Sequence, residues 1–181
     1  MVSSGVPRLY PGEAMSRRPL PFDPVAEARR QWEAHGWDDA APGMAAVTSL
    51  MRAQQIVLGR VEEVLRTFDL TFARYEVLMV LLFSRSGALP LARLGDRLQV
   101  HPTSVTNAVD RLEATDLVRR LPHPSDRRTT LAAITDAGRA VALAATEQLN
   151  AKVFADPGLD GDGVARLVGT LTEMRRRAGD F

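Results

Sequence analysis

The segment 103–114 carries side chains that can pair with nucleic-acid bases. Val105, Val109 and Leu112 follow the i, i+4, i+7 spacing of one helix face and are expected to pack inward. The opposite face presents hydroxyl, carboxamide and guanidinium groups. These are Thr103, Ser104, Thr106, Asn107 and Arg111. Asparagine pairs bidentately with adenine and arginine with guanine, while serine and threonine reach bases or phosphates. The segment therefore has the chemistry of a helix that reads the major groove of DNA.

A basic stretch follows between positions 119 and 128. Its four arginines stand against one acid, Asp126. Alternating residues predict strands on both sides of the loop, so Arg127 and Arg128 fall near a hairpin tip. Arginine at such a tip can enter a minor groove or clamp the backbone. Asp126 is predicted either to hold the Arg128 guanidinium or to close an Asx-type turn.

The elements around these two segments have the order of a winged helix-turn-helix. Apolar spacing, caps and breakers predict the fold class as mostly α with a small β-hairpin wing (α+β). The predicted helices are 24–35, which begins with Asp23 as cap and Pro24 at the first position, 42–65, a helix capped by Thr71 and reaching Leu82, 91–98, 103–114, 136–154 with Thr135 as cap, and 160–177. Turns are predicted over 84–90 and 100–102, and strands over 117–121 and 129–134.

The helices at both ends carry long apolar stripes. One stripe extends from Met44 to Leu65 and another from Val164 to Met174. Stripes longer than one chain can bury favour dimerisation. The expected organisation is a flexible tail over 1–22, N-terminal dimerisation helices over 23–68, a DNA-binding domain over 69–135 and C-terminal dimerisation helices over 136–181.

Composition excludes several other classes. The 181 residues include no cysteine, which removes thiol redox sensing, disulfides and cysteine zinc sites. The three histidines lie on separate elements, and no phosphate-binding loop or nucleophile motif is present. The chain is therefore not expected to be an enzyme, nor to need a cofactor or metal. No apolar run reaches the roughly 18 residues of a membrane span, so no membrane partner and a cytoplasmic location are expected.

Three motifs resemble the MarR family of transcriptional regulators. They are LTFARYEVL, VTNAVDRLEATDLVRR and SDRRTTLAAITDAG. The resemblance implies that the polar face of 103–111 is the recognition surface, that Arg128 reads DNA from the wing, and that Asp126 orients it. It also implies a homodimer on double-stranded DNA, with a ligand pocket between the dimer region and the DNA-binding lobe. Asp116 stands where the family often has glycine.

The function predicted is a sequence-specific regulator, a repressor released by a small aromatic or acidic molecule. The expected ligand site combines an aromatic segment that contains a histidine with an arginine and a tyrosine from the helix that follows Thr71. Its residues are Trp32, His35, Trp37, Arg74 and Tyr75. Aromatic packing at a dimer interface is the competing interpretation of this cluster. A winged-helix module that binds proteins and a metal-responsive regulator remain as alternative functions.

Overall fold

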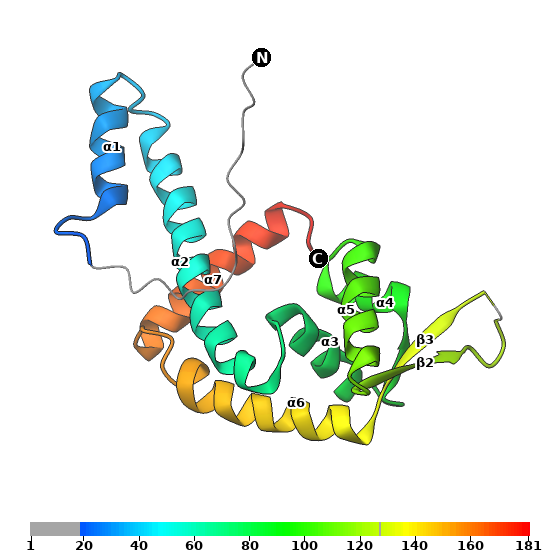
Figure 1. Cartoon of the computed structure of the whole chain (residues 1–181). Coiled ribbons are helices and arrows are strands. Elements are labelled where there is room, and N and C mark those ends of the chain that lie inside the picture. Colours follow the sequence, from blue (N-terminus) through cyan, green and yellow to red (C-terminus); the bar gives the residue numbers. More distant parts are fainter. Residues whose placement is uncertain (1–18, 127) are drawn as a thin grey trace, which may run out of the picture. The chain divides into compact units, whose positions relative to one another are not determined.

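A computed structural model of the chain describes residues 19–126 and 128–181 (Figure 1). Of the tail predicted over 1–22, residues 1–18 lie outside the described residues. The chain forms two compact units, one ending at Gly59 and one beginning at Arg60. The elements are α1 (Pro24–Ala34), α2 (Ala41–Leu65), a 3₁₀ turn (Arg66–Phe68), α3 (Phe72–Leu82), β1 (Ala88–Pro90), α4 (Leu91–Leu98), α5 (Pro102–Ala114), β2 (Val118–Pro122), β3 (Thr130–Ile134), α6 (Asp136–Leu149), a π-helical turn (Asn150–Phe154) and α7 (Gly161–Arg177).

The first unit begins with a capped helix. The carboxylate of Asp23 accepts the backbone N–H of Val25 at 2.9 Å, and Pro24 occupies the first helical position. Both features satisfy or avoid the free N–H groups of a helix start. Gly36, at φ +77°, then ends the helix. The start predicted at Asp23–Pro24 is confirmed.

The second unit has one apolar core within residues 61–153. Leucines from five helices are fully buried in it. They are Leu65, Leu78, Leu94, Leu112 and Leu149. The predicted fold class, mostly α with a small β wing, is confirmed by this architecture. No helix in the described ranges is both long and apolar enough to cross a membrane.

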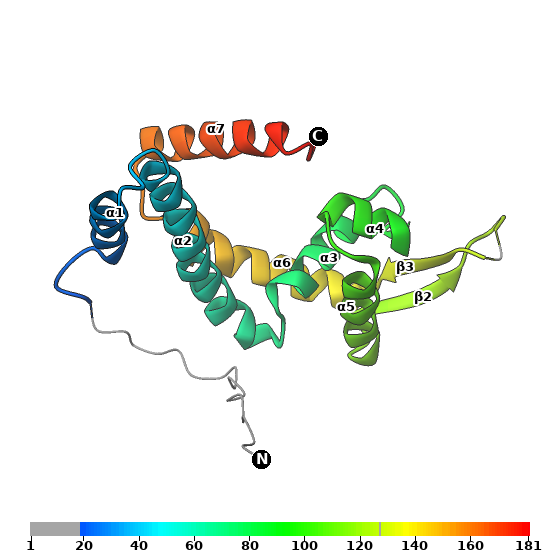
Figure 2. The same cartoon turned by 90° about the horizontal axis from the view of Figure 1, so that it is seen from above.

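The sheet has three antiparallel strands in the order β1-β3-β2. Figure 2 shows β2 and β3 extending away from α4 and α5 as a hairpin. The strand β1 corrects the sequence analysis, which assigned 84–90 to a turn. Its three residues end in Pro90, and its partner β3 lies more than 40 residues further along the chain, so local patterning does not reveal it.

The helix predicted over 136–154 changes character before its end. Its last five residues, Asn150–Phe154, form a π-helical turn. The guanidinium of Arg60 donates to the carbonyl oxygens of Lys152 at 3.3 Å and Asp156 at 2.8 Å. A widened turn leaves carbonyls without their usual helical donors, and this side chain provides one. Apolar spacing alone does not distinguish such a turn from an α-helix.

Candidate nucleic-acid interface

The exposed face of α5 contains the five polar residues expected to read DNA. Val105, Val109 and Leu112 are at most 2% exposed, which confirms the inward face. The polar positions on the other side are all exposed. They are Thr103, Ser104, Thr106, Asn107 and Arg111. The ring of His101 accepts the backbone N–H of Thr103 at 3.2 Å, so His101 is the N-cap of α5.

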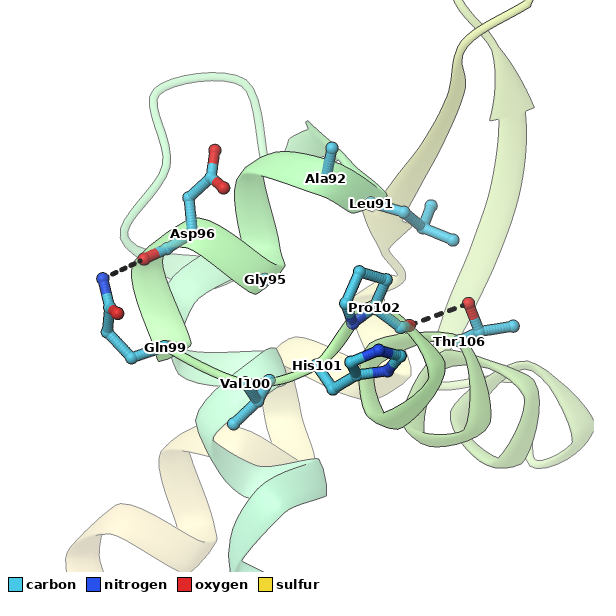
Figure 3. Close-up of a pocket in the computed structure, with 9 residues that line it drawn as sticks. All are labelled: Leu91, Ala92, Gly95, Asp96, Gln99, Val100, His101, Pro102 and Thr106. Atoms are coloured by element: carbon cyan, nitrogen blue, oxygen red, sulfur yellow. Dashed lines mark hydrogen bonds between the residues drawn. The ribbon is translucent and has the colours of Figure 1, made fainter.

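A groove of about 640 Å³ separates α4 from the start of α5 (Figure 3). The chain makes the tight turn between them with Gln99 in the left-handed conformation, at φ +53°. Within the groove the hydroxyl of Thr106 donates to the carbonyl of Pro102 at 3.1 Å. The single donor of Thr106 is thus used inside the helix. Its methyl group and lone pairs remain for contacts with a base.

A second groove, of about 560 Å³, runs between the start of α3 and α5. Ser104, Asn107 and Arg111 line it from α5, and Arg74 lines it from α3. The guanidinium of Arg74 also donates to the Thr71 hydroxyl at 3.3 Å. The structure therefore places Arg74, a predicted ligand residue, beside the recognition face. Sequence reasoning missed this proximity because α3 and α5 are about 30 positions apart.

Asp126 shapes the backbone of the wing. One carboxylate oxygen accepts the Arg128 backbone N–H at 3.0 Å, and the other accepts the Thr129 hydroxyl at 2.6 Å. The Thr129 hydroxyl and then the Arg128 N–H lower the pKa of Asp126. Of the two predicted roles, the structure shows the Asx-type turn and not a hold on the guanidinium. Arg128 is exposed, and Arg127 lies outside the described residues.

Residues 135–138, the TDAG that ends the third family motif, join the wing to α6. The Thr135 hydroxyl donates to the Asp116 carbonyl at 2.8 Å and accepts the Gly138 N–H at 2.9 Å. A Cβ on Gly138 would lie 2.1 Å from the carbonyl oxygen of Leu117, so no larger residue fits without backbone movement. Asp116 adopts φ +57°, the left-handed conformation expected where the family often has glycine.

Arg120, on β2, contacts α5 and was not singled out by sequence. Its guanidinium donates to Asp110 at 2.6 Å and also to Glu113. The Arg120 backbone N–H, followed by this side-chain hydrogen bond, lowers the pKa of Glu113. One of the arginines in the basic stretch is therefore neutralised within the protein. The spacing of an acid pair i, i+3 before a strand arginine is the signal that points to it.

The predicted ligand residues fall in both units. In the first unit the Trp37 ring lies 5.2 Å from Trp32 and 5.4 Å from His35, centroid to centroid. A pocket of about 320 Å³ beside them is also lined by Asp38 and Asp39, whose negative charge disfavours an acidic ligand there.

In the second unit Tyr75 is buried, and its hydroxyl is hydrogen-bonded to that of Thr146 at 2.9 Å. A pocket joining the aromatic cluster with Arg74 and Tyr75 stays a prediction. In residues 19–126 and 128–181, no three His, Asp or Glu side chains are grouped to hold a metal ion.

The fold and this surface define a winged helix-turn-helix protein. The MarR family model matches residues 70–130. MarR-family Sco5413 from Streptomyces coelicolor, whose crystal structure is known, is 51% identical, with a TM-score of 0.72 over 77% of this chain and 97% of that one. The chain belongs to the MarR family of DNA-binding transcriptional regulators, and that family consists of regulators and not of enzymes.

Two further relatives match about two thirds of this chain. The transcriptional regulator YhbI from Bacillus subtilis is 34% identical over 66% of this chain and 73% of its own. CouR from Rhodococcus jostii, crystallised with p-coumaroyl-CoA, is 28% identical, with a TM-score of 0.60 over 69% of this chain and 87% of its own.

Proposed function

We propose that the chain acts in the cytoplasm as a homodimeric repressor of a short pseudo-palindromic operator, released by a small organic molecule. The observation that carries the operator part is the division of α5 into two faces. Its apolar residues are buried, while hydroxyl, amide and guanidinium groups face outward. Reading DNA bases requires hydrogen-bonding groups on the exposed face of a helix, whereas packing of the core does not require them there.

The dimer part is supported by apolar side chains that a single chain leaves in solvent. On α2, Met51 is 57% exposed and Ile56 is 61% exposed. On α7, Val168 is 58% exposed and Met174 is 51% exposed. Two related copies would bury such residues against each other and would present two recognition helices to one operator.

The ligand part is supported by the aromatic cluster and by Arg74. CouR binds p-coumaroyl-CoA, a molecule with an aromatic acyl group and anionic phosphates. An aromatic ligand suits Trp32 and Trp37, whereas a carboxylate suits the guanidinium of Arg74. We therefore propose an aromatic ligand, and an acidic one only where it reaches Arg74.

Footprinting on the DNA upstream of the chain's own gene tests the operator part. Two protected half-sites about 10 base pairs apart are expected, since a symmetric dimer places its helices in successive major grooves. Protection of one half-site only, or of none, contradicts the proposal.

Thermal-shift screening of aromatic and organic acids, repeated on Trp32→Ala and Arg74→Ala, tests the ligand part. A ligand that binds the wild type and releases it from DNA should raise the melting temperature of at least one variant by less than that of the wild type. An unchanged response of both variants places the ligand elsewhere.

A further inference from the structure

Two acids of the recognition helix and one arginine of the wing form a closed cluster. We call Asp110, Glu113 and Arg120 the wing clamp. Separate guanidinium nitrogens of Arg120 reach Asp110 and Glu113, and Glu113 also accepts the Arg120 backbone N–H at 2.9 Å. The Arg120 side chain is 27% exposed, less than either acid. Both terminal nitrogens of its guanidinium thus donate to carboxylates of the protein.

The clamp closes a free sheet edge. In the order β1-β3-β2, which the described residues form, β2 is an edge strand. An edge strand leaves backbone N–H groups without a ladder partner. Glu113 accepts one of these groups and binds the side chain of the same residue. The last turn of α5 is therefore joined to β2 at both the backbone and the side chain.

The negative charges of Asp110 and Glu113 are unfavourable at this position both for the helix and for DNA binding. Asp110 and Glu113 lie near the C-terminal end of α5, where the helix dipole disfavours negative charge. They also share the helix with the groups proposed to face DNA, so their charges repel phosphates. The contacts that offset these costs are those with Arg120. This points to a role in fixing β2 on α5.

We propose that the wing clamp is a positioning device, which sets the wing in one register against the recognition helix. The base-reading face of α5 and the wing tip then meet the operator together, and Arg120 itself makes no phosphate contact. This inference rests on the proposed operator binding for its effect on affinity. The expected effect on the position of the wing does not depend on the proposed operator binding.

The first test uses a substitution for which charge removal and loss of positioning predict opposite changes in operator affinity. Glu113→Gln removes a negative charge near DNA, so electrostatics alone predicts tighter operator binding. Loss of positioning predicts binding weaker by about tenfold, the scale of one charge-assisted hydrogen bond. Asp136→Asn, at an exposed site on α6, is the matched charge control and should stay within about twofold. Tighter binding by Glu113→Gln overturns the proposal.

The salt dependence of binding tests the role of Arg120. If the Arg120 guanidinium bound a phosphate directly, Arg120→Gln would reduce the slope of log K against log salt by about 0.9. We expect weaker binding with an unchanged slope. Arg128→Gln, which removes an exposed wing cation, should reduce the slope. A slope reduced in both variants shows that Arg120 binds DNA and overturns the proposal.

Amide hydrogen exchange without DNA tests the clamp independently of operator binding. In Glu113→Gln the amides of β2 should exchange faster, while those of α3 and α6 stay protected. Unchanged exchange across β2 overturns the clamp whether or not the operator is bound. A wild type that binds no operator, with faster exchange in the variant, would contradict the proposed function and leave the clamp supported.

Discussion

The winged-helix lobe, residues 70–138, is closely packed, whereas the α2 segment up to Gly59 and the helix α7 leave much of their apolar surface exposed. Two glycines show the contrast. A Cβ on Gly138 would lie 2.1 Å from a backbone oxygen, but a Cβ on Gly169 of α7 would meet nothing within 4 Å. The packing around Gly138 is therefore complete within one chain. The flanking helices have room and apolar area for a second copy.

Alanine at these two glycines should give opposite results. Gly138→Ala forces the α6 start away from Leu117 and should cost about 3 kcal/mol or more of unfolding free energy. Gly169→Ala lies in an exposed helix and should gain about 0.5–1 kcal/mol. Urea unfolding of both variants checks this. A loss of stability in Gly169→Ala as large as that in Gly138→Ala would contradict the contrast, because α7 would then have no more room at this position than the lobe has at Gly138.

A charge on the exposed stripe should separate the copies without harming the lobe. In Met51→Asp the new carboxylate would have to be buried in the proposed dimer, which costs several kcal/mol. We expect a monomer by sedimentation, near-wild-type helix content, and operator binding weakened about 100-fold because two half-sites no longer act together. Ala53→Asp, at another exposed position of α2, tests whether a charge anywhere on this helix is enough to separate the copies. If Met51→Asp still forms a dimer, the exposed stripe of α2 is not the surface that joins the two copies.

The same contrast explains which features the sequence could predict. Caps at Asp23, Thr71 and Thr135 are local, because the side chain and its N–H partner lie two or three residues apart, and all three were predicted. The inward face of α5 was also predicted from spacing. The strand β1, the π-helical turn and the wing clamp were not. The strand β1 and the π-helical turn have partners more than 40 positions away, which local patterns do not encode. The wing clamp joins residues 7 and 10 positions apart on two different elements, so the rules for caps and helix faces do not reveal it, although the spacing of the acid pair before the strand arginine is a signal for it.

Within the lobe, the two predicted readers should lose different kinds of binding. Arg111→Ala should cost about 1–3 kcal/mol if its guanidinium pairs with guanine, and should relax specificity at one base pair. Arg128→Ala should weaken binding in proportion to the A·T content beside the half-sites, where the minor groove is narrow. Titration against operators altered at single positions distinguishes the two. Unchanged affinity in both variants would remove the readers from this surface.

Burial in the lobe raises the pKa of Glu76 on α3. The carboxylate on α3 is half-buried, and in the described residues it has no hydrogen bond or ion pair. Since burial favours the protonated form in the folded state, Glu76 lowers stability once the pH rises above its folded pKa. That cost disappears as the pH falls below the pKa of the unfolded chain. Glu76→Gln should therefore stabilise the lobe at pH 7, by less than about 1 kcal/mol because solvent screens the exposed part of the carboxylate. The gain should vanish near pH 4. Urea unfolding at the two pH values measures the difference, with Glu147→Gln on the exposed side of α6 as the control. An equal effect of Glu76→Gln at both values would show that the carboxylate is solvated, and that close packing of the lobe does not extend to this part of α3.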